Sequence, residues 1–285
     1  MTETIGIVGQ GFVGEALKEG FKKTFKVETY DKYKLSSCDS IESLCDKAKV
    51  IFVCVPTPMN RDGSCNVSIV DSVVKEIDSF SDGHVSVIKS TVPPGTTERL
   101  NAECRNSQII FNPEFLTEAN FINDFKNQTR IIIGGPRPAS SKVKNLYRKA
   151  FPETPLVKTG SSTAEMVKYF TNCFLATKVS FSNEIKQICD KIDVDYDKVV
   201  EYALYDQRLG KSHFSVPGPD GKFGFGGSCF PKDLNALIST ASDLRVMPAV
   251  LTAVWIKNLQ VRPEKDWEKL IGRAISAEKQ GEKNE

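Results

Sequence analysis

Apolar residues in the first half of the chain fall in short continuous runs that alternate with stretches of helical spacing. The runs predict strands at residues 4–8, 26–30, 50–55, 85–88, 109–111, 130–133 and 156–157. The helical spacing predicts helices at residues 15–23, 40–48, 68–80, 96–104 and 140–151. Buried strands that alternate with helices are typical of an α/β fold with a doubly wound parallel sheet, in which ligands bind at the carboxyl ends of the strands.

From residue 161 onward the strand-like runs stop and the pattern is helical. It predicts helices at about residues 164–192, 196–204, 232–242, 248–261 and 263–277. The first of these is long for a globular helix and is expected to connect two domains. We therefore predict an α/β domain over residues 1–160, an all-helical domain over 161–277 and a charged, frayed tail over 278–285.

Composition adds only limits to this picture. The 285 residues are 40% hydrophobic and 26% charged, which is typical of a soluble globular protein. A net charge of +2 without a basic block argues against nucleic acid or a membrane surface as a partner, and no long apolar run or charged leader is present, which favours the cytoplasm. Eight cysteines without a Cys-x-x-Cys pair, and only two histidines, predict neither a metal site nor a disulfide framework.

The first predicted strand leads into a glycine-rich turn, Gly9-Gln-Gly11-Phe-Val-Gly14, and then into a helix. This is the dinucleotide-binding fingerprint of a Rossmann-like domain in its required context. Gly9 permits the turn, Gly11 lets a pyrophosphate approach the main chain, and Gly14 lets the helix pack close to the strand. The second strand ends at Asp31, whose carboxylate suits a ribose 2′-hydroxyl and repels a 2′-phosphate. NAD is therefore the predicted cofactor, with Lys32 beside that carboxylate.

Two proline- and threonine-rich loops follow predicted strands, at Val55–Pro58 and Lys89–Gly95. They could present the hydroxyls of Thr57 and Thr91 to the ribose or the nicotinamide of the cofactor, and equally they are ordinary turn sequences. A third loop of this kind carries Glu114 and Glu118. Their spacing is that of neighbours on one face of a helical turn, and a solvated acidic pair is the alternative interpretation.

The segment Phe223–Asn235 places one thiol, Cys229, between a glycine-rich loop and a predicted helix start. Pro231 fits the first position of that helix, and a helix N-terminus favours a thiolate over a thiol. Lys232 and Asp233 place both signs of charge within one turn of the sulfur. Cys229 is thus a candidate nucleophile, the alternative being a buried structural cysteine.

Lys168 and Asn172 lie four residues apart on the long predicted helix and so share one of its faces. Beside a dinucleotide-binding domain, such a pair can bind an alkoxide, the lysine through its charge and the asparagine through its amide. An exposed lysine is the alternative interpretation.

Four motifs resemble those of the UDP-glucose/GDP-mannose dehydrogenases and occur in that family's order. They are Lys89-Ser-Thr-Val-Pro-Pro-Gly95, Asn112-Pro-Glu-Phe-Leu-Thr-Glu118, Lys168-Tyr-Phe-Thr-Asn172 and Gly224-Phe-Gly-Gly-Ser-Cys-Phe-Pro-Lys-Asp233. The resemblance extends from the N-terminus to about Trp255. It implies an enzyme that oxidises the primary alcohol of a nucleotide sugar to a carboxylate with two NAD molecules in succession. UDP-glucose, giving UDP-glucuronate, is the expected substrate, and GDP-mannose or a UDP-N-acetylhexosamine is the alternative.

The resemblance also implies a role for each residue at a matching position. Cys229 is expected to be the nucleophile, Lys168 and Asn172 to hold the alkoxide and later the oxyanion, Asp233 to orient water and Lys168, Glu114 to be the base for hydrolysis, and Thr91 to lie near the nicotinamide. The implied substrate contacts are Phe115, Leu116, Glu118, Arg208, Phe225 and Gly226, with Arg208 reaching the sugar site of the neighbouring subunit of a homodimer built on the long helices. The implied cofactor contacts are Gly9, Gly11, Phe12, Val13, Gly14, Asp31, Lys32, Thr57, Thr91, Glu118 and Lys232.

The chemistry explains why these residue types are needed. An alcohol loses one hydride to give an aldehyde, and a second hydride can leave only after the carbonyl carbon becomes tetrahedral again. A thiolate achieves this by forming a thiohemiacetal, which is oxidised to a thioester. Hydrolysis of the thioester then needs a carboxylate base and a cationic or amide site for the oxyanion.

Members of this family carry a second doubly wound domain after the long linking helix, and the present sequence stops about where that domain is expected to begin. Loss of binding contacts remote from the reacting carbon would lower turnover as well as affinity. Two further hypotheses therefore stand beside the main one. In one, the chain is a β-hydroxyacid dehydrogenase, which needs no cysteine. In the other, it is a truncated, non-catalytic NAD-binding subunit.

Overall fold

The computed structural model describes residues 2–277, so the tail predicted over 278–285 lies outside the described residues. The chain divides into two compact units. The first contains the chain up to Thr57 together with Val67–Lys168, and the second contains Pro58–Asn66 and the chain from Tyr169 onward. The predicted domain boundary after residue 160 stays a prediction.

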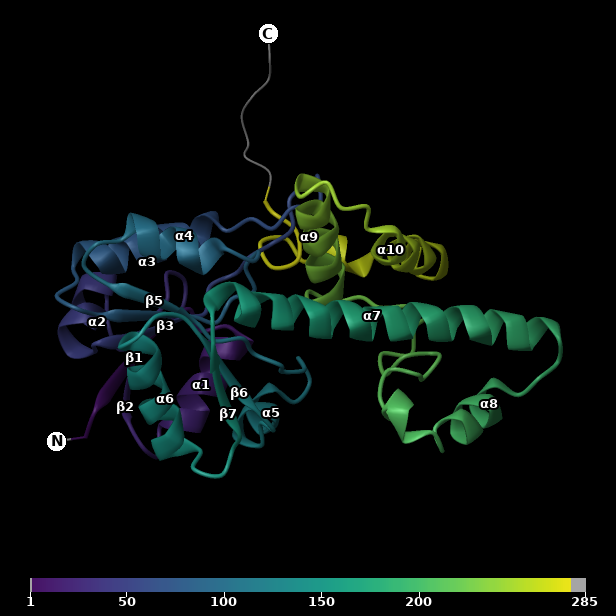
Figure 1. Ribbon diagram of the computed structural model, residues 1–285, viewed down its shortest axis with the longest axis horizontal. Coiled ribbons are helices and arrows are strands. Elements are labelled where there is room, and N and C mark those ends of the chain that lie inside the picture. The colour runs from purple at the N-terminus through teal and green to yellow at the C-terminus, as the bar shows by residue number, and fades with distance from the viewer. Residues whose placement is uncertain (1, 278–285) are drawn as a thin grey trace, which may run out of the picture. The chain divides into compact units, whose positions relative to one another are not determined.

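The first unit is a seven-stranded sheet with helices on both faces (Figure 1). Its strands are β1 (Thr4–Val8), β2 (Lys26–Tyr30), β3 (Val50–Val53), β4 (Val85–Ile88), β5 (Gln108–Phe111), β6 (Ile131–Gly134) and β7 (Leu156–Thr159), in the spatial order β2-β1-β3-β4-β5-β6-β7. Its helices are α1 (Phe12–Phe21), α2 (Ile41–Lys47), α3 (Ser68–Ser79), α4 (Thr96–Glu103), α5 (Phe121–Lys126) and α6 (Ala139–Ala150). The α/β fold class predicted from the sequence is confirmed.

Five strands, β1 to β5, are parallel, but β6 pairs with β5 in the antiparallel sense, and β7 is parallel to β6. The sheet predicted to be parallel is therefore mostly parallel, with the pair β6 and β7 running opposite to the other five strands. The connection from β5 to β6 contains only the six-residue helix α5, which rises about 9 Å and packs against α1. This connection does not return the chain to the end of the sheet where β5 begins, which a parallel pairing of β5 and β6 would require.

Two hydrophobic clusters cover the two faces of the sheet. Side chains of α1, α5 and α6 form one with one face of the strands, and side chains of α2, α3 and α4 form the other. Phe21 is at the centre of the first cluster. Its buried ring lies between 5.2 and 5.8 Å from those of five other aromatic residues, namely Phe25, Phe52, Phe125, Tyr147 and Phe151.

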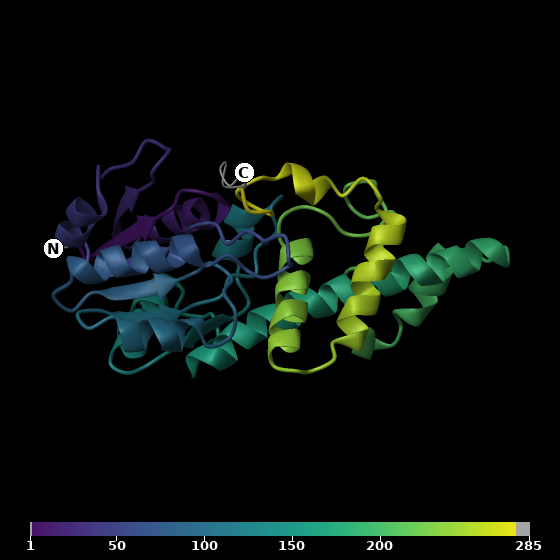
Figure 2. The same ribbon diagram turned by 90° about the horizontal axis from the view of Figure 1, so that it is seen from above.

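The second unit is built mainly from helices. They are α7 (Ser161–Lys191), which enters this unit at Tyr169, then α8 (Tyr196–Ala203), the 3-10 helix η1 (Gln207–Leu209), α9 (Phe230–Asp243), α10 (Ala249–Val261) and the 3-10 helix η2 (Asp266–Lys269). Figure 2 shows α9 and α10 packed side by side. Among residues 2–277, no helix combines the length and the apolar character needed to cross a membrane.

The helix predicted over residues 263–277 is wrong. After η2 the chain turns at Gly272, whose φ of +77° is incompatible with a continued helix, and Ile271 then bridges to Ile275. Trp267 within η2 is buried, with its ring 5.2 Å from that of Trp255. Burial of this ring, rather than helical periodicity, sets the local path of the chain.

Replacing Phe21 by alanine is expected to lower the free energy of unfolding by about 3–5 kcal/mol, because it leaves a cavity among five aromatic rings. Chemical denaturation followed by circular dichroism measures this change. The matched control is Phe80→Ala at the end of α3, where the ring is exposed; an equal loss in both variants would contradict the central place of Phe21 in the core.

Candidate active site

The glycine-rich turn after β1 has the geometry that its sequence predicts. Gly9 has a φ of +91°, and a Cβ there would lie 2.7 Å from the carbonyl oxygen of Cys54. A Cβ at Gly14 would lie 1.9 Å from the carbonyl oxygen of Gly9, so α1 approaches the turn as closely as backbone allows. At Gly11, the N-cap of α1, a Cβ would meet no atom within 4 Å. Open backbone at a helix N-terminus suits a pyrophosphate, so the turn fits the predicted cofactor.

Asp31, at the end of β2, is bound by backbone N–H groups on both carboxylate oxygens. Gln10 N donates to Oδ2 at 2.6 Å, and Tyr33 N and Lys34 N donate to Oδ1 at 2.9 and 3.1 Å. Burial raises the pKa of Asp31, but these hydrogen bonds outweigh it and hold the pKa below its ordinary value. The carboxylate is therefore ionised at neutral pH beside the turn, while Lys32 is exposed.

The remaining cofactor contacts predicted in the first unit lie near the carboxyl ends of β1, β3, β4 and β5. Thr57 and Thr91 are buried, Val13 is half-buried, and Glu118 is exposed. The Phe12 ring packs 5.2 Å from the ring of Phe121. Their roles in cofactor binding stay predictions.

Glu114 and Lys168 form a buried ion pair in the first unit. Lys168 Nζ donates to Glu114 Oε1 at 2.8 Å and to the Glu114 carbonyl oxygen at 2.7 Å. The two side chains are only 11% and 3% exposed. Burial raises the pKa of Glu114, but the charge and the hydrogen bond of Lys168 outweigh it and keep the pKa below its ordinary value. The loop after β5 thus presents an ionised carboxylate to a fixed ammonium group on α7.

The loop that carries Glu114 is not helical, so the predicted helical pairing of Glu114 with Glu118 is wrong. Residues 112–117 have no regular secondary structure, and a turn covers 118–120. Pro113 disfavours helical backbone at the residue before it. In addition, Glu114 Oε2 accepts from Leu116 N at 2.7 Å, a local bond that competes with a helix.

A second lysine, Lys89, is buried next to this loop, and the sequence reasoning gave it no role in the site. Its Nζ donates to Asn112 Oδ1 at 3.0 Å and to the Pro113 carbonyl oxygen at 3.3 Å. Burial lowers the pKa of Lys89 to about 8. A lysine placed directly after the buried strand β4 was the sequence signal for such a buried cation.

Glu165, also missed, is wholly buried in the first turns of α7. It accepts hydrogen bonds from Gly95 N at 2.6 Å, from Thr97 N at 2.9 Å and from Thr97 Oγ1 at 2.6 Å. Burial raises the pKa of Glu165, and these three bonds oppose the rise. The carboxylate fastens the loop that carries Thr91 to the helix that carries Lys168.

The described residues line two pockets of note. One of about 330 Å³ is bounded by Lys89, Glu114, Phe115 and Leu116 on one side and by residues 123–130 on the other. Arg130 also lines it, with its guanidinium carbon 3.9 Å from the centre of the Phe115 ring. Two predicted substrate contacts, Phe115 and Leu116, therefore line a cavity next to the ion pair.

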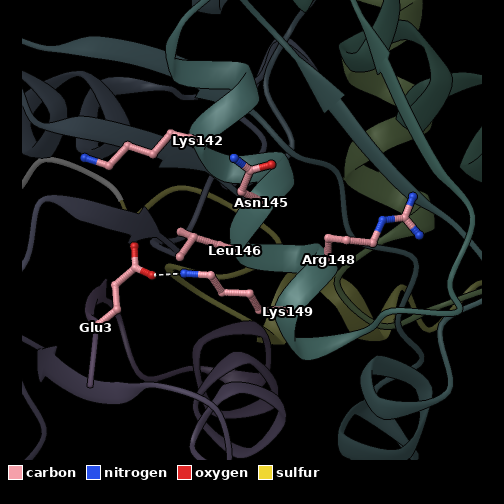
Figure 3. A pocket seen from close by; sticks show the side chains of 6 residues that line it. All are labelled: Glu3, Lys142, Asn145, Leu146, Arg148 and Lys149. Atoms are coloured by element: carbon pink, nitrogen blue, oxygen red, sulfur yellow. Dashed lines mark hydrogen bonds and ion pairs between the residues drawn. The ribbon is translucent and has the colours of Figure 1, made fainter. Parts of the chain in front are cut away.

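The larger pocket, of about 440 Å³, lies along α6 (Figure 3). It is lined by Glu3, Lys142, Asn145, Leu146, Arg148 and Lys149. Its one ion pair among the residues drawn joins Lys149 to Glu3 at 2.7 Å, with both side chains largely exposed. None of the predicted site residues lines it, and we assign it no role.

In the second unit, Cys229 is the N-cap residue of α9 and is half-buried. Pro231 is the second residue of the helix, one position later than predicted, and still lies in its first turn. The next charged residues form a compact set. Lys232 Nζ donates to Asp233 Oδ1 at 2.5 Å, and Asn172 Nδ2 donates to Asp233 Oδ2 at 2.6 Å. Burial lowers the pKa of Lys232. The charges of Asp233 and then of Cys229 and Cys65 raise it by more, so the net pKa is above its ordinary value and the ammonium form persists. A cation thus faces the Cys229 thiol from the first turn of its own helix.

Other predicted substrate contacts lie elsewhere in the second unit. Arg208 is largely exposed, with Nε 2.9 Å from Asp206 Oδ1. Phe225 is buried against Trp255 and Phe230. Gly226 is half-buried in the loop before Cys229. Their contacts with a substrate stay predictions.

Comparison with known proteins identifies both halves of the chain. Residues 16–151 match the NAD binding domain, and residues 162–259 the central domain, of the UDP-glucose/GDP-mannose dehydrogenase family. The first unit therefore carries the family's NAD-binding domain, and the predicted cofactor is confirmed.

Two similar curated proteins are the UDP-glucose 6-dehydrogenase TuaD of Bacillus subtilis, 34% identical over 216 residues, and the UDP-glucose 6-dehydrogenase of Rhizobium meliloti, 37% identical over 222 residues. The matches cover 73% and 74% of this chain but 46% and 50% of those proteins. The chain thus spans about half the length of these relatives. A solved UDP-glucose dehydrogenase from the archaeon Pyrobaculum islandicum is 30% identical with a TM-score of 0.84, covering 95% of this chain and 71% of that one.

Replacing Lys168 by methionine is expected to lower the free energy of unfolding at pH 7 by about 3 kcal/mol, because it leaves the Glu114 carboxylate buried without its cation. Adding Glu114→Gln should restore part of this loss, which a double-mutant cycle measured by chemical denaturation would detect. The control is Lys149→Met in the exposed pair with Glu3, where the loss should be far smaller. Independent, additive effects of the two buried substitutions would contradict the coupling.

The ion pair between Glu114 and Lys168 should also make the stability of the protein depend on pH. The folded pKa of Glu114 lies below its unfolded value of 4.5, so its stabilising contribution is present above pH 4.5 and is lost as the pH falls through the folded pKa. The difference in stability between the wild type and Glu114→Gln should therefore shrink from pH 6 to pH 3.

Proposed function

Because the chain belongs to the UDP-glucose/GDP-mannose dehydrogenase family, as its four motifs predicted, we propose that it catalyses the four-electron oxidation of UDP-glucose to UDP-glucuronate with two molecules of NAD. The observation that carries the proposal is the placement of Cys229 at the N-terminus of α9, with Lys232 in the same turn and with Asp233 bonded to Asn172. A thiol in this setting is suited to nucleophilic attack on an aldehyde.

NAD, when bound, accepts one hydride in each of the two oxidations, and Gly9, Gly11, Gly14 and Asp31 would hold it. Lys168 and Asn172, one helical turn apart on α7, bind the oxygen of the reacting carbon first as an alkoxide and later as an oxyanion. The Cys229 thiolate adds to the aldehyde, forming the carbon–sulfur bond of a thiohemiacetal. After the second oxidation the resulting thioester is hydrolysed, and the C–S bond breaks with return of the thiolate.

Glu114 removes the proton from the attacking water in this last step. Its lowered pKa keeps it in the carboxylate form that a base requires at neutral pH. Asp233 accepts from the Asn172 amide and so fixes its orientation, which leaves the second N–H of that amide for the oxyanion.

A homodimer is the second part of the proposal. Four of the large apolar side chains exposed on α7 follow one another at spacings of four, seven and seven residues, namely Phe170 (68%), Phe174 (55%), Phe181 (60%) and Ile188 (50%). This spacing places them on one face of the helix, and the rings of Phe170 and Phe174 stack 6.1 Å apart. A second copy of the same face would bury this stripe, and Arg208 would then serve the partner's sugar site.

Purified protein supplied with UDP-glucose and NAD is expected to release two NADH per sugar, counted by absorbance against a known amount of substrate. Parallel assays use GDP-mannose and UDP-N-acetylmannosamine. Cys229→Ser should lower formation of the carboxylate by about 1,000-fold or more, because the aldehyde can no longer become tetrahedral through sulfur.

Each other outcome points to a different function. One NADH per sugar would argue against the thioester, and full activity of Cys229→Ser would favour a hydroxyacid dehydrogenase. Binding of NAD in calorimetry without NADH from any sugar nucleotide would indicate a non-catalytic subunit.

Replacing both Phe174 and Phe181 by aspartate is expected to weaken a dimer by about 30-fold or more, because four charges would enter the apolar interface. Sedimentation velocity over a range of concentrations measures this. The control is Phe80→Asp, an exposed ring of the first unit. A monomeric wild type, or a double variant that still dimerises at the same concentration, would refute the proposed interface.

A further inference from the structure

Arg262, at the C-terminal end of α10, is a buried arginine that the proposed chemistry does not use. It is only 2% exposed, and its guanidinium makes four hydrogen bonds. Nε and Nη2 donate to the two carboxylate oxygens of Asp266 at 2.8 and 3.0 Å, Nη2 donates to Asp220 at 2.6 Å, and Nη1 donates to the Phe223 carbonyl oxygen at 3.3 Å. The carboxylates of Asp220 and Asp266 are partly exposed, so the guanidinium is the buried member of this ionic cluster. A buried charge of this kind contributes little net stability, which leaves room for a role in positioning the neighbouring loop.

The loop Phe223–Gly227 is bound along its backbone by this cluster and two asparagines. Gly224 N donates to Asn183 Oδ1 at 3.1 Å, and Phe225 exchanges two bonds with the Asn258 amide, at 2.7 and 3.0 Å. Gly227 N donates to the Asp266 carboxylate. Side chains from α7, α10 and η2 therefore fix the main chain up to two residues before Cys229.

The same contacts leave no room for a side chain at two glycines of this loop. A Cβ at Gly224 would lie 2.4 Å from Asn258 Oδ1. At Gly226 it would lie 2.4 Å from Asp266 Oδ1 and 2.5 Å from Arg262 Nη2. At both positions the close approach is to protein side chains. The backbone of the loop thus lies directly against the guanidinium.

We propose that Arg262 is a positioning residue for Cys229, acting through Asp266 and the loop Phe223–Gly227. This inference rests on the proposed function in that Cys229 is taken as the nucleophile. A fixed loop holds Cys229 as the N-cap of α9, where the helix N-terminus and Lys232 favour the thiolate. A loosened loop would let the sulfur leave this position.

The charged and polar groups around Cys229 come from several elements. Lys232 and Asp233 lie on α9, and Cys65 contributes to the same electrostatic environment of Lys232. Ser228 Oγ is 3.9 Å from Cys229 Sγ and accepts from Arg273 Nη2 at 3.3 Å. None of the four bonds of Arg262 reaches the sulfur, so Arg262 can act on the thiol through the loop or through its charge across space. Asp266→Asn separates the two, because loss of that negative charge would by itself favour the thiolate, whereas a loosened loop would disfavour it.

The test measures the rate at which iodoacetamide alkylates Cys229, by mass spectrometry of the peptide, as a function of pH. In Arg262→Met the midpoint of the rate profile should rise by about one pH unit relative to the wild type, because the thiolate loses its favoured position. Arg262→Lys should shift it less, since it keeps the charge but not the bidentate bond to Asp266. Greater exposure of the thiol to water would by itself favour the thiolate and lower the midpoint, so a rise cannot come from a mere gain in accessibility.

The control is Lys257→Met on the same helix, which breaks an ion pair with Glu184 at 3.1 Å and touches none of the loop, so the midpoint should not move. If Arg262→Met does not fold, Asp266→Asn removes the same link and should give the same upward shift. A folded variant of either kind with an unchanged midpoint overturns the proposal. The assay needs neither NAD nor a sugar nucleotide, so failure of the proposed oxidation would leave its result intact.

Discussion

The ion pair between Lys168 and Glu114 is the interaction on which the proposed chemistry most depends. The two residues are 54 positions apart in the chain, and their charged atoms meet at 2.8 Å with both side chains nearly excluded from water. Neither charge would be tolerated there alone. The loop after β5 is therefore held to α7 by electrostatics. Lys89 fixes the same loop by donating hydrogen bonds to Asn112 and to the Pro113 carbonyl oxygen.

The second unit follows the same physical rule with different partners. Asp233 is buried, and its charge is balanced by Lys232 and bound by the Asn172 amide. Arg262 is balanced by two carboxylates. In each case a buried charge has a partner within its own unit, so each unit can keep its polar side chains in one arrangement without solvent. Such preorganised groups are what stabilises charge that develops during a reaction.

Much of this could be predicted from the sequence where the cause is local. The buried strands appear in the sequence as apolar runs, and the turn at Gly9 requires glycine for its backbone conformation. The start of α9 follows from Pro231 and the residues around it. What could not be predicted depends on distant partners. The reversal of β6 follows from where a short helix packs, and the burial of the Glu114 carboxylate depends on an ammonium group 54 residues away. Glycine is required at 224 because of the Asn258 amide and at 226 because of Arg262 and Asp266, all of them distant in the sequence.

The resting pair also bears on how Glu114 can act as a base. A carboxylate whose pKa is lowered by an adjacent ammonium group accepts a proton poorly. In the proposed reaction, however, Lys168 turns to the oxygen of the reacting carbon, and Glu114 then loses the hydrogen bond and part of the attraction that lowered its pKa. Its basicity therefore rises at the step that produces the oxyanion, while burial, which raises the pKa throughout, stays in place. In the proposed reaction Glu114 is therefore a weak base while it is paired with Lys168. Once Lys168 binds the oxygen of the reacting carbon, the same carboxylate becomes a strong enough base to serve hydrolysis.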